Sequence, residues 1–196
     1  GCISINNSNL IKRANYILDK GTNRQDFITN YKKKIISSNN KKFYSWVDLG
    51  SEYRASELSC ALLYSQLLKI GKIQKKRELI WKSFKSNLDK INTGVFYIVE
   101  PPKNTKSSYH LFVMIFKNKN LSKKFIGFMQ KNGIAATFHY VPLHKSKMAS
   151  KFKRQKLNIT EDIYSRIVRL PLYPSMKRNI QLRIISKIKK FVYDQK

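Results

Sequence analysis

The sequence predicts a mixed α/β chain that ends in a small α+β domain. Hydrophobic residues make up 42% and aromatic residues 12% of the 196 residues, which is enough to bury a core. Between Val95 and Tyr193 short apolar strand patterns alternate with amphipathic helix patterns, an order typical of an antiparallel or mixed sheet with helices. Before this region an apolar stripe at helical spacing runs through residues 56–89 and predicts a long connecting helix.

The N-terminal residues predict one strand and one helix. Isoleucines alternate with a serine over residues 3–5, a period typical of a short strand, and an asparagine-rich turn follows. Ser8 or Asn9 could then cap a helix over residues 10–20, whose apolar side chains share one face, and Gly21 ends it.

Residues 22–46 show no clear period. Within them, residues 32–42 are rich in lysine, asparagine and serine, a composition that predicts a surface loop or insertion.

The strongest periodic segment is residues 56–89. Ser56 is a plausible N-cap, Glu57 lies in the first turn, and the apolar stripe is interrupted weakly by Gly71. A single helix of this length would extend about 50 Å at 1.5 Å per residue. We therefore expect it to bridge two packing layers or to lie along a subunit interface.

The C-terminal half supplies the elements of the small domain. The patterns predict strands over residues 95–99, 109–116 and 134–140, and helices over residues 121–131, 160–168 and 179–193. Pro171 and Pro174 are expected to bracket a stiff turn before the last helix.

The chain is strongly basic, with 40 Lys and Arg against 11 Asp and Glu and a formal net charge of +29. Such a field attracts nucleic acid or an anionic membrane surface. However, 31 of the basic residues are lysines and nine are arginines, whereas proteins that recognise nucleic acid favour arginine. Lysine, asparagine and isoleucine have A/T-rich codons, so we interpret the charge mainly as codon drift. A basic nucleic-acid- or polyanion-binding module remains the alternative.

Other features of the sequence restrict the class of protein. Cys2 and Cys60 are too few for a disulfide framework and too isolated for a metal cluster, which favours a reducing compartment. No apolar run is long enough for a membrane span, and the N-terminus does not have the pattern of a signal peptide. We therefore expect a cytoplasmic protein. The chain starts at Gly1 without an initiator methionine, and we expect it to be a piece of a longer protein.

The three histidines are candidate ligand-binding residues. His139 and His144 flank a proline in the segment FHYVPLH, where a strand end and a fixed turn could present two imidazoles and the phenol of Tyr140 to an anionic ligand such as a phosphate. No cysteine or carboxylate lies near them in the sequence, so no metal site is predicted. His110 is expected to be a strand residue satisfied by a backbone partner.

The residues alone do not predict a complete catalytic centre. No pair of nucleophile and base is visible, and the seven glycines do not form a phosphate-binding loop at a helix start. The chain therefore resembles the accessory part of an active site.

Six segments carry a resemblance to a known family, in order along the chain: residues 21–27 (GTNRQDF), 44–53 (YSWVDLGSEY), 56–58 (SEL), 64–67 (YSQL), 138–144 (FHYVPLH) and 169–173 (RLPLY). Together they resemble the C-terminal half of the sugar-nucleotide aminotransferases, fold type I enzymes that use pyridoxal phosphate. Within that family the resemblance is strongest to the dTDP-4-amino-4,6-dideoxygalactose transaminases, which are associated with enterobacterial common antigen.

The resemblance implies a fold and a division of the chain. It implies the last strand and helix of the large domain, then the long connecting helix, then the small α+β domain. Residues 1–50 would be a remnant of the large cofactor-binding domain with an inter-subunit loop, and residues 51–196 the long helix and the small domain. In the family the lysine that holds the cofactor lies in the N-terminal half, and none of the 31 lysines here matches it. We therefore expect no catalytic residue in this segment and no transamination by it alone.

The resemblance also implies which residues bind the cofactor. Residues 21–27 and 50–54 resemble parts that reach across a homodimer to the neighbouring active site, so Tyr53 and Arg54 would contact pyridoxal phosphate. Glu52 departs from the family pattern, because a carboxylate would repel a phosphate.

Residues that contact the substrate are implied in the same way. Asn23, Arg24, His139, Tyr140 and His144 would contact the nucleotide-sugar. The lysine-rich residues 145–147 depart from the family pattern, and residues 32–42 look like extra length.

The implied reaction is the transfer of an amino group from glutamate to C4 of a dTDP-4-keto-6-deoxyhexose for surface polysaccharide biosynthesis. The partners would be this nucleotide-sugar, glutamate, a second copy of the chain and an N-terminal half, which could be a separate chain. A non-catalytic relic that folds poorly is a further alternative. The exact sugar and nucleotide are left open by these residues.

Overall fold

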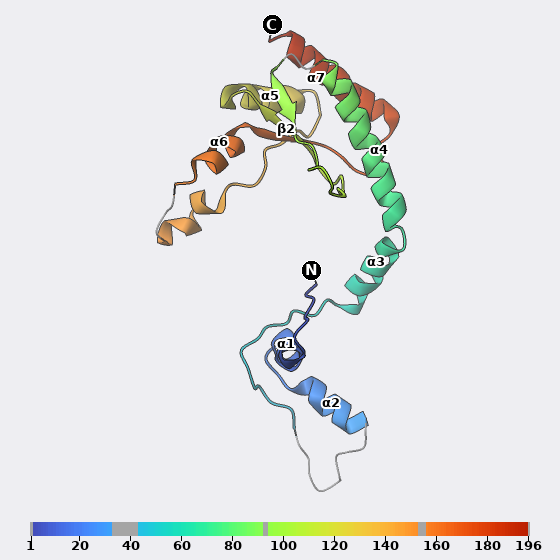
Figure 1. Ribbon diagram of the computed structural model, residues 1–196, viewed down its shortest axis with the longest axis vertical. Coiled ribbons are helices and arrows are strands. Elements are labelled where there is room, and N and C mark those ends of the chain that lie inside the picture. Colours follow the sequence, from blue (N-terminus) through green and yellow to red (C-terminus); the bar gives the residue numbers. More distant parts are fainter. Residues whose placement is uncertain (1, 33–42, 92–93, 153–155, 196) are drawn as a thin grey trace. The chain divides into compact units, whose positions relative to one another are not determined.

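The computed structural model describes residues 2–32, 43–91, 94–152 and 156–195 (Figure 1). The chain forms two compact units, Gly1–Leu67 and Leu68–Lys196. Residues 51–67, which we grouped with the small domain, therefore lie in the first unit. The assignment of residues 1–50 to a remnant of a larger domain remains an expectation.

Within its described residues the first unit contains four helical elements: η1 (Ser8–Leu10), α1 (Ile11–Leu18), α2 (Arg24–Lys32) and α3 (Glu57–Leu67). The side chain of Asn7 accepts a hydrogen bond from the backbone N–H of Asn9 and caps η1, one residue earlier than predicted. Lys20 and Gly21 both have positive φ angles of 58° and 77°, which ends the helix as the glycine predicted.

The predicted strand over residues 3–5 is wrong. These residues have no strand structure, and Ile3 is 87% exposed. A strand is stabilised by hydrogen bonds to a neighbouring strand, and none of the described residues supplies one here. The alternating pattern was therefore insufficient by itself.

The region expected to be irregular begins with a helix. Helix α2 starts at Arg24, and the backbone N–H of Phe27 donates to the carbonyl of Asn23 at 3.2 Å. The predicted loop over residues 32–42 lies, from residue 33 onward, outside the described residues.

The predicted single helix over residues 56–89 is two helices, α3 and α4 (Ile70–Asp89). Ser56 caps α3 as expected, because its Oγ accepts from the backbone N–H of Ser59 at 3.2 Å. The helical pattern stops at residues 68–69 and restarts at Ile70. Gly71 lies in the first turn of α4 and has a low helix propensity, which makes a break at this point inexpensive.

The second unit is an α+β domain with a three-stranded antiparallel sheet in the order β1–β2–β3. Its strands are β1 (Phe96–Ile98), β2 (Phe112–Phe116) and β3 (Ile167–Leu170), and its helices are α4, α5 (Lys119–Lys131), α6 (Asn158–Arg166) and α7 (Arg178–Tyr193), with short turns η2 (Leu143–Lys145) and η3 (Met148–Lys151). The register places Tyr97 opposite Ile115 and Val113 opposite Arg169. The prediction of a small α+β domain is confirmed.

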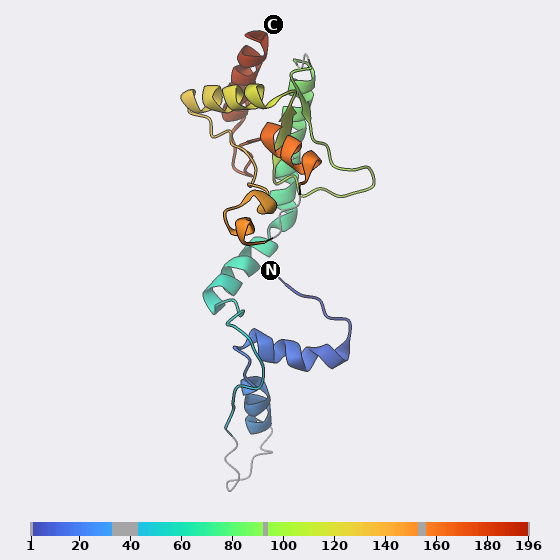
Figure 2. The same ribbon diagram turned by 90° about the vertical axis from the view of Figure 1, so that its left-hand side faces the viewer.

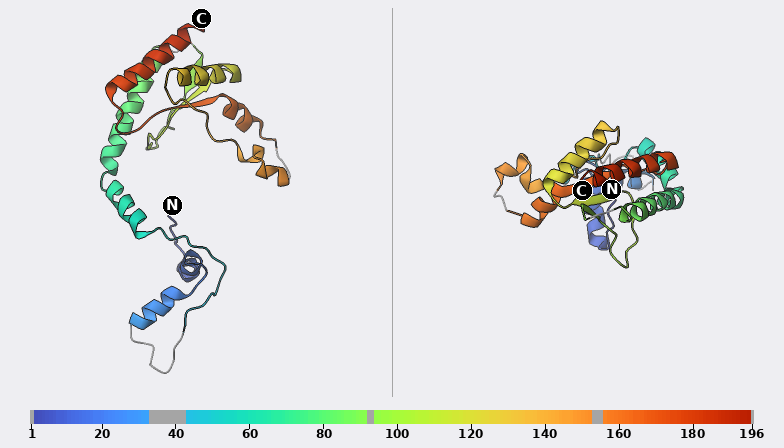
Figure 3. Two further views of the ribbon diagram at one scale, coloured as in Figure 1. Left: turned by 180° about the vertical axis from the view of Figure 1, so that it is seen from behind. Right: turned by 90° about the horizontal axis from the view of Figure 1, so that it is seen from above.

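Helices cover the sheet and close the core of this unit. Helix α7 lies alongside α4, and the loop between β1 and β2 extends away from the sheet (Figures 2 and 3). The fully buried side chains are mostly aromatic or long aliphatic: Phe84, Leu88, Phe112, Met114, Phe116, Phe125, Met129, Val168, Ile188 and Val192. Rings pack directly, with the centroids of Phe116 and Phe125 4.8 Å apart.

One strand prediction and one helix prediction in this unit need correction. Residues 134–140 do not form a strand, although Thr137 makes one isolated bridge to Arg169. The predicted helix over residues 160–168 ends at Arg166, where β3 begins. Ile167 and Val168 are β-branched and pair with β2, so tertiary pairing overrides the helical pattern at this point.

Among the described residues, none of the helices is long and apolar enough to cross a membrane.

Candidate ligand-binding site

In the first unit two loops pack closely against each other. The bridges Asp19–Glu52 and Thr22–Trp46 join residues 19–22 to residues 46–52. A Cβ atom added to Gly21 would lie 1.8 Å from the backbone oxygen of Asp48, so the loops approach more closely than a side chain allows. This explains locally why the segment GTNR begins with glycine.

Four charged side chains pair across these loops. Arg54 Nη2 lies 2.9 Å from Oδ2 of the buried Asp19, and Lys20 Nζ lies 2.5 Å from Oε2 of Glu52. The contact of Arg54 with Asp19 is an ion pair without hydrogen-bond geometry, since the same Oδ2 atom has no hydrogen-bond donor among the described residues. The hydrogen bond from Lys20 holds the pKa of Glu52 below its ordinary value. Glu52 is therefore compensated within the chain.

The structure brings the predicted residues Asn23, Arg24, Tyr53 and Arg54 into this one unit. Asn23 Oδ1 accepts a hydrogen bond from the backbone N–H of Ser45 at 2.7 Å, so its carbonyl group holds the loop. Arg24 is exposed in the first turn of α2, and Tyr53 is 66% exposed. Both are accessible to a ligand.

The residues predicted to meet the cofactor phosphate do not form a complete phosphate site by themselves. Arg54 is held by Asp19, and Lys20 is held by Glu52. Within the described part of this unit, Arg24 is a cation with no ion pair, and one cation by itself does not make a phosphate-binding site. Pyridoxal phosphate would need further donors besides these residues.

In the second unit His139, Tyr140 and Arg169 form a cluster, which we call the histidine cluster. The ring centroids of His139 and Tyr140 lie 5.1 Å apart, and Arg169 Cζ lies 5.7 Å from the centroid of Tyr140. Arg169 Nε donates to the backbone oxygen of Phe138 at 3.2 Å. Burial, followed by the charges of Arg169 and His110, lowers the pKa of His139 from its ordinary value of 6.5. His139 is therefore a neutral imidazole near pH 7, and its buried Nδ1 has no hydrogen-bond partner among the described residues.

His144 lies in a separate pairing. Its Nε2 is 3.2 Å from Oε1 of Glu161, and Lys145 Nζ is 2.8 Å from Oε2 of the same carboxylate. These contacts, led by that of Lys145, lower the pKa of Glu161. A carboxylate distant in sequence thus engages the imidazole that was expected to face the substrate.

His110 lies just before β2, and its partner differs from the expected backbone group. Ser108 Oγ lies 2.7 Å from His110 Nδ1. Tyr109, between them, has a φ angle of 47°, which is rare for an aromatic residue. This conformation delays the predicted strand from residue 109 to residue 112.

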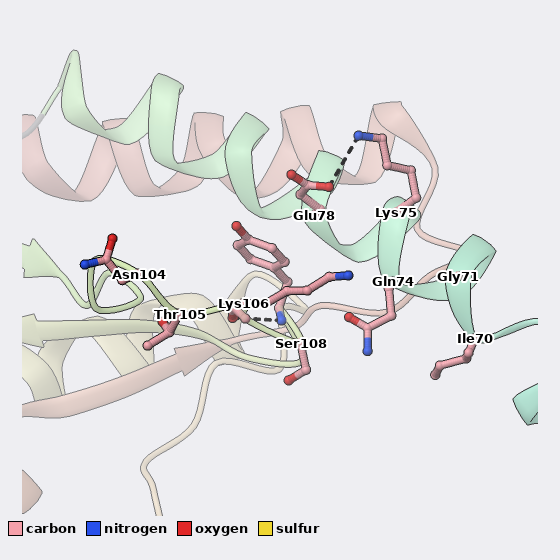
Figure 4. Close-up of a pocket in the computed structure, with 11 residues that line it drawn as sticks. Ile70, Gly71, Gln74, Lys75, Glu78, Asn104, Thr105, Lys106 and Ser108 are labelled. Atoms are coloured by element: carbon pink, nitrogen blue, oxygen red, sulfur yellow. Dashed lines mark hydrogen bonds and ion pairs between the residues drawn. The ribbon is translucent and has the colours of Figure 1, made fainter.

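Ser108 also lines a groove of about 860 Å³ in the second unit. One wall is the N-terminal part of α4 and the other is the loop of residues 104–109 (Figure 4). Lys75 lies on the helix wall, paired to Glu78 at 3.4 Å, and Lys106 lies on the loop wall. His110, the partner of Ser108, follows directly after the loop wall of this groove.

In the described ranges no group of three or more His, Cys, Asp or Glu side chains could hold a metal ion.

Sequence reasoning missed two residues that the structure places at the centre of these clusters. Asp19 is buried beside Arg54, and Arg169 contacts both Phe138 and Tyr140. A signal existed for Arg169, because it is the one charged residue within the apolar segment IVRL of β3. No comparable signal marked Asp19, since its burial depends on residues more than thirty positions later.

A model of the DegT/DnrJ/EryC1/StrS aminotransferase family matches residues 1–189. The chain is 23% identical over 194 residues to dTDP-3-amino-3,6-dideoxy-alpha-D-galactopyranose transaminase of Aneurinibacillus thermoaerophilus, covering 98% of this chain and 47% of that protein. It is 25% identical over 181 residues to UDP-4-amino-4,6-dideoxy-N-acetyl-beta-L-altrosamine transaminase of Helicobacter pylori, covering 90% of this chain and 44% of that protein. The chain thus spans about half the length of the curated relatives it matches.

Solved structures share the fold. Helicobacter pylori PseC, an aminotransferase involved in the biosynthesis of pseudoaminic acid, superposes with a TM-score of 0.77 at 22% identity over 96% of this chain and 47% of that chain. The PLP-form of a putative sugar aminotransferase, Spr1654 from Streptococcus pneumoniae, has a TM-score of 0.75 at 16% identity over 97% of this chain and 45% of that chain.

Proposed function

The chain belongs to the DegT/DnrJ/EryC1/StrS aminotransferase family, whose cofactor is pyridoxal phosphate, and we propose that it is the C-terminal portion of a sugar-nucleotide aminotransferase. The observation that carries the proposal is the family match over residues 1–189, which includes both loop regions of the first unit and the histidine cluster of the second.

The proposed reaction moves an amino group from glutamate to C4 of a dTDP-4-keto-6-deoxyhexose, for surface polysaccharide biosynthesis of the enterobacterial common antigen type. Two features of the relatives support parts of this proposal. One is named for a dTDP-linked amino sugar and another for a 4-amino-4,6-dideoxy sugar. The combination of a dTDP nucleotide with a C4 amino group rests on the resemblance of the sequence segments to the dTDP-4-amino-4,6-dideoxygalactose transaminases.

In this proposal the second unit contributes substrate contacts. His139 and Tyr140 lie side by side, with Tyr140 exposed and His139 neutral, so the pair offers hydrogen bonds to sugar hydroxyl groups without adding charge. In this proposal His144 acts indirectly: its pairing with Glu161 holds the turn η2, in which His144 lies. Asn23 and Arg24 extend from the first unit toward the active site of a second copy in a homodimer.

The cofactor supplies the electron sink that lets the amino group move between two carbon skeletons. We propose that the lysine that holds it comes from an N-terminal half and that these 196 residues do not transaminate alone. The proposal is supported by the lack of a lysine that matches the family position and by the incomplete phosphate site around Arg54.

The test compares the chain alone with the chain joined to an N-terminal half that carries the cofactor lysine. Each is assayed with glutamate and dTDP-4-keto-6-deoxyglucose for 2-oxoglutarate and amino sugar. Only the joined protein is expected to bind pyridoxal phosphate and form the amine. A joined protein that neither shows the absorbance of bound cofactor nor forms the amine would refute the enzymatic proposal.

Matched substrates test the finer assignment. A dTDP-3-keto sugar and a UDP-linked 4-keto sugar differ from the proposed substrate in one feature each. A higher kcat/KM for either of them would overturn the C4 or the dTDP part of the proposal and leave the reaction class intact.

A further inference from the structure

Arg169 is held in place by hydrogen bonds on both sides of its strand. On one side it is the pairing partner of Val113 in β2. On the other side its backbone N–H donates to the carbonyl of Thr137 at 2.7 Å, and its carbonyl accepts from the N–H of Thr137 at 3.1 Å. Its Cα therefore cannot shift without breaking sheet hydrogen bonds.

The side chain is fixed as well. Its Nε donates to the carbonyl of Phe138, and its planar group lies over the ring of Tyr140. Within the described part of the chain, the two Nη atoms of Arg169 have no hydrogen-bond acceptor and no ion-pair partner. A guanidinium in this state has lost most of its side-chain freedom but keeps its outward donors.

We propose that Arg169 binds an anionic oxygen of the enzyme's ligand, a phosphate or a carboxylate oxygen, through its two Nη atoms. The proposal rests on the proposed function, because nucleotide-sugar and glutamate are the anions that such an enzyme meets. Guanidinium groups bind both kinds of oxygen with two parallel hydrogen bonds.

The surroundings of Arg169 favour an anion. The charges that act on His139 are those of Arg169 and His110, and no carboxylate is among the causes of its pKa shift. The pKa of His139 is lowered, so Arg169 supplies the positive charge of the cluster at neutral pH. The carboxylate of Glu161, the partner of His144, is shared between His144 and Lys145.

The experiment follows the imidazole proton signals of the 196-residue chain by NMR at low salt. The chain has three histidines, so His139→Gln identifies the signal of His139. The chain is titrated separately with dTDP and with L-glutamate. Saturable movement of the His139 signal is expected with one of the two probes, which identifies the anion as a phosphate or a carboxylate.

Three variants test the role of Arg169. Arg169→Gln is expected to weaken binding of that probe about tenfold, because one charge-assisted contact contributes about 1.5 kcal/mol. Arg169→Lys keeps the charge but not the planar guanidinium group, and its affinity for the probe is expected to lie between that of the wild type and that of Arg169→Gln. Arg183→Gln is the matched control, since Arg183 also donates to a loop carbonyl, that of Asn132 at 2.7 Å, and should bind as the wild type does.

The outcomes separate cleanly. Failure of both probes to move the His139 signal, or equal affinity of the wild type, Arg169→Gln and Arg169→Lys, would overturn the inference. Unchanged signals of His110 and His144 would show that Arg169→Gln is folded. If those signals change, Arg169→Lys is used for the comparison with the wild type. Amino transfer by the joined protein without anion binding at Arg169 refutes this inference alone, whereas anion binding without amino transfer refutes the proposed function alone.

Discussion

Gly21 shows how one residue fixes the loop that carries Asn23 and Arg24. Its φ angle of 77° lies in the left-handed region, and an added Cβ would lie 1.8 Å from the backbone oxygen of Asp48. Backbone atoms cannot move aside as a flexible side chain can.

We predict that Gly21→Ala destabilises the first unit by about 1–3 kcal/mol, through strain at positive φ together with the steric clash. Urea unfolding monitored by limited proteolysis within residues 1–67 would measure the change. Gly127→Ala is the control, because Gly127 lies inside α5 with no atom near its Cβ position, and alanine there should stabilise by about 0.5–1 kcal/mol. Equal effects of the two substitutions would contradict the steric explanation.

His139 makes the stability of the second unit depend on pH. The pKa of His139 in the folded chain lies below 6.5, its ordinary value in the unfolded chain. Between these two pKa values the unfolded chain binds more protons at His139 than the folded chain does. The free energy of unfolding therefore rises with pH through this window and reaches its full value above 6.5.

We predict that acidification through this window destabilises the wild type and that His139→Gln removes this part of the dependence. Urea midpoints measured between about pH 5 and 8 would show it as a smaller slope in the variant. His110→Gln is the comparison variant: it removes one of the charges that lower the pKa of His139 and should reduce the slope less than His139→Gln does. An unchanged slope in His139→Gln would assign the dependence to other groups.

At the scale of elements, α3 is richer in apolar residues than α4, yet α4 is the helix that packs into a core. Helix α4 buries Ile80, Trp81, Phe84 and Leu88, whereas α3 has no buried residue and exposes Leu58 to 82%. Helical spacing predicted one helix over residues 56–89, and it could not tell which part of that helix, or which face, would be covered. Only packing partners decide that.

We predict that Phe84→Ala in α4 costs about 3–5 kcal/mol, because a fully buried ring leaves a cavity against Phe112. Leu79→Ala on the same helix is the control, since Leu79 is 57% exposed, and should change stability by less than about 0.5 kcal/mol. Urea denaturation followed by tryptophan fluorescence measures both. A small loss for Phe84→Ala would mean that α4 does not close this core.

At the scale of the whole molecule, the net charge of +29 is the feature to explain. Several lysines are used in local pairs, such as Lys75 and Lys82 with Glu78 in α4, and so stabilise helix surfaces. An arginine is used where a directed hydrogen bond holds a loop, as Arg169 shows with the carbonyl of Phe138.

We predict that the chain binds duplex DNA weakly and without sequence preference, through charge alone. Fluorescence anisotropy with two unrelated duplexes should give equal affinities, with a dissociation constant no tighter than about 10⁻⁶ M at physiological salt and a steep loss as salt rises. Tight, sequence-dependent binding at that salt would favour a nucleic-acid-binding module over an enzyme segment.

The sequence by itself determined the helices at residues 10–20, 121–131 and 179–193, the strand core of β1 and β2, and the segments that place the chain in its family. These features depend on local spacing, capping and motif order, which a single sequence records directly. The tertiary structure alone decided the loss of the strand at residues 3–5, the division into α3 and α4, and the appearance of β3. It also decided the pairings of Asp19 with Arg54, His144 with Glu161 and Arg169 with Phe138. Except for the division into α3 and α4, where Gly71 makes a break inexpensive, each of these depends on whether a partner distant along the chain is present, and the period of a sequence contains no information about which distant residue will be adjacent.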